Sequence, residues 1–387
     1  MKQRPGLFLA VCASAAFIGL GGGAARAQVT PAEGYTPVDD TPSARAGGTI
    51  FADYTWQAEP KTTDADGNSI HPNAFNITRA YINITGNISH LISFRITPDV
   101  VRVGSVSLPN NGGSADLAGL TGTLTYRLKY AYGQLNFDDL GNTAMHDIAQ
   151  WRGSWLRLGM QQTPYVDFEE GIYRYRFAGT VFADREGFLS SSDLGASMHV
   201  NFPQNYGDIH VGVYNGETYT RPEANDQKAF QIRGTVRPLP MFGPLKGLRL
   251  TAFYDGDHYI KDAKRERFVG LITYEHPYVN FGAQYLKAKD QNASASKPVV
   301  EAEGFSVWAT PRTPWGLEAL LRWDRIDPNT AGTARRQRLM AGPAYWFPVQ
   351  KGVAAAVLLQ FEQLRYMGAP NSKPTEERWS LNTLFNF

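Results

Sequence analysis

Cysteine is almost absent from this sequence, because Cys12 is the only one among 387 residues. A chain with so little cysteine needs no oxidative folding, and without Cys12 it offers no thiol chemistry. The formal net charge is also small, at +2. All three charged residues among the first 27 are basic. Without that segment the balance is −1, which excludes a general binder of nucleic acid.

The amino terminus has the order of a secretory signal peptide. Lys2 and Arg4 precede an apolar run over 7–20, and small residues follow up to Ala27. The run is shorter than the roughly 20 residues that cross a bilayer, so a retained anchor is the weaker alternative. We predict cleavage after Ala27, leaving residues 28–47, rich in Pro, Ala and Thr without periodicity, as a flexible periplasmic leader.

Long hydrophobic runs are missing from the rest of the chain, where the longest spans only residues 353–359. From residue 48 onward, apolar and polar residues alternate instead. In the last segment Trp379 and Leu381 fall on one face, and Arg378 and Asn382 fall on the other. A period of two is that of a β-strand with one apolar face. Such segments predict about sixteen strands, near 48–59, 74–86, 88–101, 121–137, 153–161, 191–202, 207–215, 227–237, 246–257, 263–276, 277–289, 299–311, 314–327, 335–347, 352–366 and 376–387.

The connections favour an outer-membrane barrel, in which short inner turns alternate with long outer loops. Only the fourth link, 138–152, is long for an inner turn. An even strand number lets the sheet close, as lipid requires. The terminal Phe387 resembles the signal by which barrel-assembly machinery recognises its substrates. We therefore expect an all-β, closed antiparallel transmembrane barrel over 48–387, in the outer membrane of a Gram-negative-type bacterium; a secreted β-sandwich or solenoid is the alternative.

Several short motifs resemble those of the phosphate-selective porin O and P family. The segment 156–165 (LRLGMQQTPY) contains a Gly-x-x-x-x-Pro-aromatic pattern, and Phe168-Glu169-Glu170 follows it. The resemblance implies a 16-stranded, commonly trimeric, anion-favouring diffusion channel. Further segments that resemble this family are Arg79-Ala80-Tyr81, Val213-Tyr214-Asn215-Gly216, Asp226 to Lys228, Arg233, Arg237-Pro238, Arg322-Trp323-Asp324 and Asp327-Pro328-Asn329.

If the apolar phase of each strand faces lipid, the other phase lines the lumen. Basic residues outnumber acidic ones on that phase, which predicts a mild preference for anions. The alternative is that these side chains pair with neighbouring carboxylates and only hold the wall. The predicted pore-lining residues are Arg79, Arg95, Arg127, Lys129, Arg157, Arg233, Arg249, Arg267, Arg322, Arg338 and Arg378, against Asp53, Asp255, Glu275, Glu318, Asp324 and Glu362.

The third outer link, about 162–190, is the longest, and long loops in compact domains are usually functional. We predict that it folds into the lumen and narrows it, with its carboxylates facing the arginines so that a transverse field orients solutes. The alternative is an outer loop packed on a neighbouring subunit. The predicted constriction residues are Asp167, Glu169, Glu170, Arg174, Arg176 and Arg185.

No catalytic residue, metal ligand or cofactor is predicted. His199 and His210 fall on inward phases without a Ser-Asp arrangement, which favours polar lining, and the turn at 64–68 lacks the closing Glu of a calcium loop. The expected function is a general porin for small polar or anionic solutes. Its expected partners are bilayer lipid, the barrel-assembly machinery and further copies in a homotrimer, with no nucleic acid. A phosphate- or oxyanion-specific channel remains open, as does a non-conducting barrel acting as enzyme, adhesin or anchor.

Overall fold

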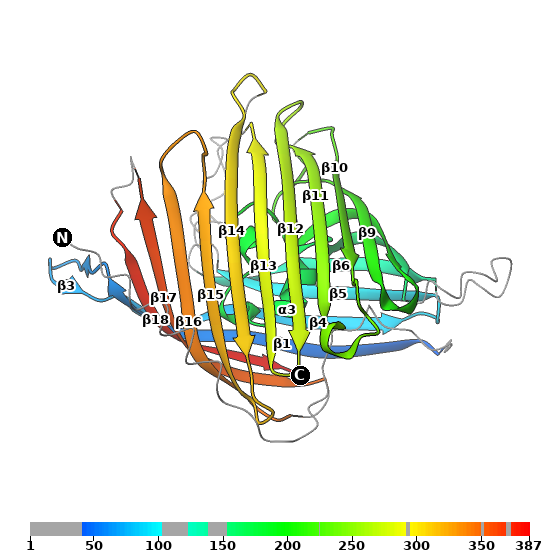
Figure 1. The fold of residues 1–387 in the computed structure, drawn as a ribbon, viewed down its shortest axis with the longest axis horizontal. Helices are drawn as coiled ribbons and strands as arrows, with labels where there is room; N and C mark the ends of the chain where they lie inside the picture. Colours follow the sequence, from blue (N-terminus) through cyan, green and yellow to red (C-terminus); the bar gives the residue numbers. More distant parts are fainter. Residues whose placement is uncertain are drawn as a thin grey trace.

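The computed structural model describes residues 41–102, 123–137, 153–223, 225–291, 295–349, 352–368 and 373–387. The predicted signal peptide 1–27 and most of the predicted leader lie outside this part of the chain. Within it, sixteen antiparallel strands close into one barrel (Figure 1), which confirms the predicted fold class. These strands are β1 (Ser43–Glu59), β4 (Asn73–Asn87), β5 (Ile92–Arg102), β6 (Leu124–Asn136), β7 (Trp155–Gln162), β8 (Ser192–Asn201), β9 (Gly207–Tyr214), β10 (Ala229–Val236), β11 (Leu248–His258), β12 (Lys264–His276), β13 (Val279–Asp290), β14 (Val300–Pro311), β15 (Leu317–Asp327), β16 (Arg335–Trp346), β17 (Ala354–Met367) and β18 (Glu376–Asn386).

The first and last strands seal the barrel. Tyr54 of β1 lies opposite Leu381 of β18 on one side and opposite Phe75 of β4 on the other. Every strand therefore has two neighbours and no edge is left unpaired. β1 begins at Ser43, inside the segment expected to be a leader, and the hairpin of β2 (Thr62–Thr63) and β3 (Ser69–Ile70) lies in the loop after it. Among the described residues, no helix is long and apolar enough to cross a membrane.

Alternation along each strand separates an apolar outside from a largely polar inside. On β11 and β12, Leu250 and Ile272 are 44% and 47% exposed, whereas Arg249 and Thr273 are buried. Successive side chains point to opposite faces of a strand, so one apolar phase coats the outer surface of the whole barrel. The inner phase carries the charged and amide side chains.

On the amino-terminal strands β4 and β6, β-bulges shift this phase. On β6, Tyr130 pairs with Thr97 and Leu128 pairs with Pro98, which leaves Lys129 as an extra residue. Lys129 and Tyr130 consequently both lie inside, each 4% exposed. A similar register shift at Thr78 changes the face of the sheet to which the following side chains of β4 point. A prediction from strict alternation misses these shifts, because a bulge adds one residue to one strand and so moves the following side chains to the opposite face.

Loop 3, defined as residues 163–191 between β7 and β8, packs inside the barrel. It contains α3 (Val166–Tyr173), the short turn η4 (Arg176–Ala178) and α4 (Phe182–Arg185). Its apolar side chains form one cluster with the inner face of β11–β18 and with Phe51 of β1. Figure 1 shows α3 within the ring of strands. Two further short turns, η5 (Pro203–Asn205) and η6 (Gly243–Leu245), connect β8 to β9 and β10 to β11.

Candidate functional site

The first anchor of loop 3 is a buried carboxylate on α3. Glu169 Oε1 accepts hydrogen bonds from Gln284 Nε2 at 2.7 Å and Trp308 Nε1 at 3.2 Å. Burial raises the pKa of Glu169, while Arg322 and these hydrogen bonds oppose the rise. Asn280 Nδ2 donates to the carbonyl of Ile172 at 2.8 Å. Side chains of β13 and β14 thus hold α3 against the wall.

Two glycines on the inner phase make room for these contacts. A Cβ on Gly282 would come within 2.4 Å of the Trp308 indole, and a Cβ on Gly304 would come within 2.5 Å of Phe182. Both glycines let an aromatic ring approach the backbone of the wall closely. The position of Trp308, and hence its bond to Glu169, depends on this space.

The second anchor is Tyr175, which follows α3 and is fully buried. Its hydroxyl donates to Glu318 Oε2 at 2.9 Å and accepts from Trp346 Nε1 at 3.1 Å. Arg174 Nη1 forms an ion pair with Glu318 Oε1 at 3.2 Å. Burial raises the pKa of Tyr175, and the charge of Glu318 adds to that rise. The hydroxyl is therefore neutral and available as a donor.

All eleven predicted basic residues lie on the inner face, and the structure divides them into groups. Arg267 donates to the Phe188 carbonyl at 3.1 Å and Arg322 to the Thr180 carbonyl at 2.8 Å. These two side chains are 1% and 2% exposed, and they bond to loop 3. Carboxylate partners are Asp99 for Arg79 and Arg127, Asp208 for Arg233, Glu275 for Arg249, Asp290 for Arg267, Asp324 for Arg322, Glu362 for Arg338 and Glu376 for Arg378.

The other three are held by aromatic and amide groups. The guanidinium of Arg95 lies 4.5 Å from the Tyr130 ring centre. Lys129 Nζ lies 4.8 Å from the ring centre of Tyr81. Arg157 stacks on Trp155, with 3.6 Å between its Cζ and the ring centre. Cation–π contact holds the charge in place without cancelling it.

In some ion pairs of the inner wall and loop 3 the cation is the more exposed partner, whereas Asp208 and Asp290 are more exposed than their partners Arg233 and Arg267. Asp99 is fully buried, whereas its partners Arg79 and Arg127 have side chains that are 25% and 27% exposed. Arg174 is 28% exposed against 5% for Glu318. At these three pairs the guanidinium groups reach water and the carboxylates lie behind them.

Asp167 and Asp184 of loop 3 lie near the strands that carry Arg79 and Lys129. Asp167 Oδ2 accepts from the Tyr130 hydroxyl at 2.9 Å. Burial raises the pKa of Asp184, opposed by the charges of Arg176, Lys129 and Arg79. The predicted transverse field needs carboxylates of the loop to lie near basic residues of the wall, and these contacts have that arrangement.

Glu170 of α3 is a buried loop carboxyl whose pKa is raised towards neutrality. It forms an ion pair with Arg176, with 2.7 Å between Oε1 and Nε. Burial raises the pKa of Glu170 to about 7. Arg176 opposes this rise and Asp167 adds to it. The carboxyl can therefore change its charge within the physiological pH range.

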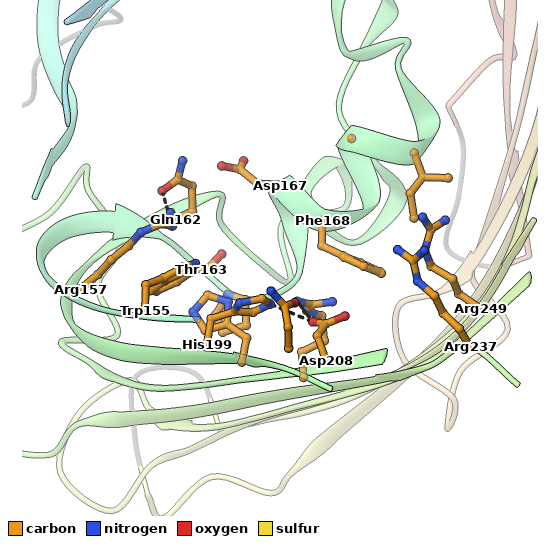
Figure 2. A pocket seen from close by; sticks show the side chains of 16 residues that line it. Trp155, Arg157, Gln162, Thr163, Asp167, Phe168, His199, Asp208, Arg237 and Arg249 are labelled. Atoms are coloured by element: carbon orange, nitrogen blue, oxygen red, sulfur yellow. Dashed lines mark hydrogen bonds and ion pairs between the residues drawn. The ribbon is translucent and has the colours of Figure 1, made fainter. Parts of the chain in front are cut away.

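His199 and His210 line a cavity of about 170 Å³ between loop 3 and strands β7–β11 (Figure 2). His199 Nε2 lies 3.2 Å from Asp208 Oδ2, and its ring stacks on Trp155. Asp64 Oδ1 accepts from the backbone of residues 66 and 68, so that segment is a polar turn. In the described part of the chain, no cluster of three or more His, Cys, Asp or Glu residues is placed to hold a metal ion.

Sequence reasoning missed the residues that hold loop 3 in place. Gln284 and Trp308 lie on the inner phase but were not assigned a role, and Trp346, whose position near a strand end suggested an aromatic girdle, instead contacts Tyr175 inside the barrel. A signal was present, because apolar residues such as Leu320 and Met340 interrupt the polar inner phase of β15 and β16. An apolar patch on the inner face of a barrel indicates a loop packed against it.

Comparison with known proteins supports the fold of the chain. No family model matches the sequence, and no curated protein matches it. Among solved structures, the anion-selective porin from Comamonas acidovorans has a TM-score of 0.58 at 10% identity, covering 90% of this chain and 100% of that one. Outer-membrane expressed OmpT of Vibrio cholerae has a TM-score of 0.56 at 11% identity, covering 90% of this chain and 98% of that one.

A third match is the outer membrane channel DcaP of Acinetobacter baumannii, with a TM-score of 0.55 at 11% identity, covering 89% of this chain and 97% of that one. Identities this low establish the fold and no more. The phosphate-selective O and P family is therefore not identified by the comparisons. The closed barrel of sixteen strands and the likeness to these channels together show that the chain has the fold of an outer-membrane porin.

Proposed function

We propose that this protein is an outer-membrane porin, a water-filled channel for passive diffusion of small hydrophilic solutes with a mild preference for anions. The fold, the apolar outer phase and the charged inner phase support this function. One of the similar structures is described as an anion-selective porin. The proposal needs no cofactor and no energy coupling.

The preference for anions depends on the unequal exposure of the ion pairs. Asp99 is shielded from water while two arginines share it and reach the lumen. An ion in a narrow, low-dielectric lumen senses the nearer charge most strongly, because the field there is weakly screened. Cations at the wall surface therefore attract anions even though most of them are paired.

Seven of the predicted pore-lining residues divide between two roles in this proposal. Arg79, Arg95, Arg127, Arg338 and Arg378 contact solutes from the wall. Glu170 and Asp167 on loop 3 supply the opposite side of a transverse field. The buried side chains of Arg267 and Arg322 instead hold loop 3 in the lumen.

We further propose export by the signal peptide 1–27, assembly through the terminal Phe387 and residence in the outer membrane. A homotrimer is the proposed oligomer, supported by the description of one similar structure, OmpT of Vibrio cholerae, as a trimer form. Its TM-score is 0.50 at 11% identity. Phosphate selectivity, which the sequence resemblance implies, is a separate outcome of the experiment below.

Planar-bilayer recording across a potassium chloride gradient tests the proposal. Discrete conductance steps with a reversal potential shifted towards chloride are expected. The double variant Arg95→Gln, Arg127→Gln should reduce that shift, and it leaves Arg79 to pair with buried Asp99. Arg365→Gln is the control, because Arg365 is exposed on the outer phase of β17.

Three results would contradict parts of the proposal. Absence of conductance steps would indicate a non-conducting barrel. An unchanged reversal potential in the double variant would show that these arginines do not contact the ion path. Saturation of the current by micromolar inorganic phosphate would replace the general porin with a phosphate-specific channel.

A further inference from the structure

A second cavity lies on the inner face of β1, β4, β5 and β6, beside the short turn 88–91 that joins β4 to β5. Its volume is about 370 Å³, and sites for small ligands occupy about 300–1,000 Å³. Arg45 and Arg95 both line it, whereas the lining residues in the described part of the chain include no carboxylate. The lining of this cavity is therefore positively charged.

Strand pairing places the two arginines in one row across the wall. Arg45 of β1 lies opposite Thr85 of β4, and Thr85 lies opposite Arg95 of β5. Neighbouring strands are about 4.8 Å apart, so the Cα atoms of the two arginines are about 10 Å apart with one threonine between them. Residues directly opposite each other share a face of the sheet. We call Arg45, Thr85 and Arg95 the basic row.

The two arginines differ in how many of their donors are engaged. Arg95 donates from Nε to Thr97 and from Nη2 to Asn83, each at 3.0 Å, and its guanidinium lies over the Tyr130 ring. These partners are neutral, and Nη1 has none among the described residues. Arg45 is exposed, and no described residue forms a hydrogen bond or ion pair with its side chain. The whole fork of Arg45 and one nitrogen of Arg95 are therefore available to a solute.

A row of neutral polar side chains lies next to the basic row, on the side of the turn. Ser43 lies opposite Asn87, and Asn87 lies opposite Ser93. Each is two residues from the basic row along its strand, or about 7 Å. These three residues, the neutral row, have side chains without a hydrogen-bond partner in the described chain. Hydroxyl and amide groups both donate and accept, so they match the hydroxyl groups of a sugar.

The rest of the lining is either engaged or apolar. Arg157 stacks on Tyr132, with 4.7 Å between its Cζ and the ring centre, and donates from Nε to Gln134 at 2.7 Å. Tyr132 and Gln134 therefore close one side of the cavity and take no part in binding. An apolar ligand would find little surface here, since Phe94 alone among the lining residues contributes a side chain of several carbons without polar atoms.

We infer that this cavity binds sugar acids, which are small polyhydroxylated carboxylates, with the carboxylate at the basic row and the hydroxyl groups at the neutral row. The fork of Arg45 and Nη1 of Arg95 match the two oxygens of one carboxylate, because a guanidinium donates to both in parallel. The inference rests on the proposed channel function, since the solute reaches the cavity through the lumen. It names a class of solute that the channel retains near one end.

Isothermal titration calorimetry on the full chain in detergent tests this inference, with sodium glucuronate as the probe. Saturable binding of one glucuronate per chain is expected. Sodium acetate and glucose should each bind at least about tenfold more weakly, because acetate lacks the hydroxyl groups and glucose lacks the charge. Arg45→Gln should weaken glucuronate binding by about tenfold or more, the usual effect of losing a charged hydrogen bond. Arg45→Lys keeps the charge without the fork and should restore part of the affinity.

Asn87→Ala separates the roles of the two rows. It should weaken the binding of glucuronate and leave that of acetate unchanged, because acetate has no hydroxyl group for the neutral row. Arg365→Gln is the control, since it removes a charge from the outer phase of β17 and should bind glucuronate as the unmodified chain does.

Equal heats for glucuronate and sodium chloride would overturn the inference, as would unchanged binding in Arg45→Gln with a native circular dichroism spectrum. Equal affinities for acetate and glucuronate would overturn the assignment to sugar acids. Tighter binding of glucose 6-phosphate than of glucuronate would overturn the assignment to a carboxylate. Binding and conduction are read separately. Conductance without glucuronate binding refutes only this inference, whereas glucuronate binding without conductance refutes only the channel.

Discussion

Tyr175 gives the most direct test of how loop 3 is held inside the barrel. Replacing it by Phe removes one hydroxyl and keeps the ring among its neighbours. Two hydrogen bonds are lost, one donated to Glu318 at 2.9 Å and one accepted from Trp346 at 3.1 Å. A bond to a charged group contributes about 1.5–3 kcal/mol and a neutral one about 1 kcal/mol. The ion pair of Arg174 with Glu318 remains.

The expected loss is about 2–4 kcal/mol in the free energy that separates the packed loop from its opened form. Opening of the loop should then increase by about 30-fold to several hundred-fold. Hydrogen exchange measures this directly, because amides of a locally opening segment exchange in proportion to the open population. Protection of the amides of Arg174 and Ala178, bonded to the carbonyls of Glu170 and Tyr175, should fall by that factor.

Strand amides of β13 should keep their protection in the same sample, since the barrel itself is unchanged. Tyr126→Phe is the matched control, because Tyr126 is 58% exposed and loses a hydroxyl without contacting loop 3. Equal protection of loop 3 in Tyr175→Phe and the unmodified chain would refute the view that this hydroxyl anchors the loop. A loss of protection spread over the whole barrel would refute it as well.

Three further predictions follow from the same wall. Glu170 has its pKa raised to about 7 from an ordinary value near 4.5, so the packed loop holds a proton that the opened loop releases. Packing of the loop is most favoured below pH 4.5 and weakens as pH rises through 7. Bilayer recordings should therefore show an anion preference that increases from pH 8 to pH 6 in the unmodified chain, and a reversal potential independent of pH in Glu170→Gln. A reversal potential independent of pH in the unmodified chain would contradict this prediction. Gly282→Ala should displace Trp308 and lower the midpoint of thermal unfolding. Gly171→Ala is the control, because a Cβ there meets nothing within 4 Å. Equal unfolding midpoints for Gly282→Ala and the unmodified chain would show that Trp308 does not need the space beside Gly282. Arg338→Glu should move selectivity towards cations while Arg322→Glu should mainly loosen loop 3, and identical exchange profiles for the two variants would refute this division.

The sequence alone determined the barrel. A period of two over sixteen segments assigns one phase outward and the other inward, and only closure satisfies the backbone of every strand. The inward phase of Arg249 and Arg322 was readable for the same reason. The position of the third outer link inside the barrel was predicted from its length and composition.

Only the tertiary structure decided which inward charges meet water. Arg322 and Arg79 share a phase, yet one lies sealed against loop 3 and the other reaches the lumen. That difference arises from contacts between residues more than a hundred positions apart, such as Tyr175 with Glu318. The bulge at Lys129 and the convergence of four arginines on one cavity arise in the same way. Strand periodicity fixes the direction of a side chain, whereas the packing of a loop across the lumen fixes its surroundings, and alternation in the sequence contains no record of that packing.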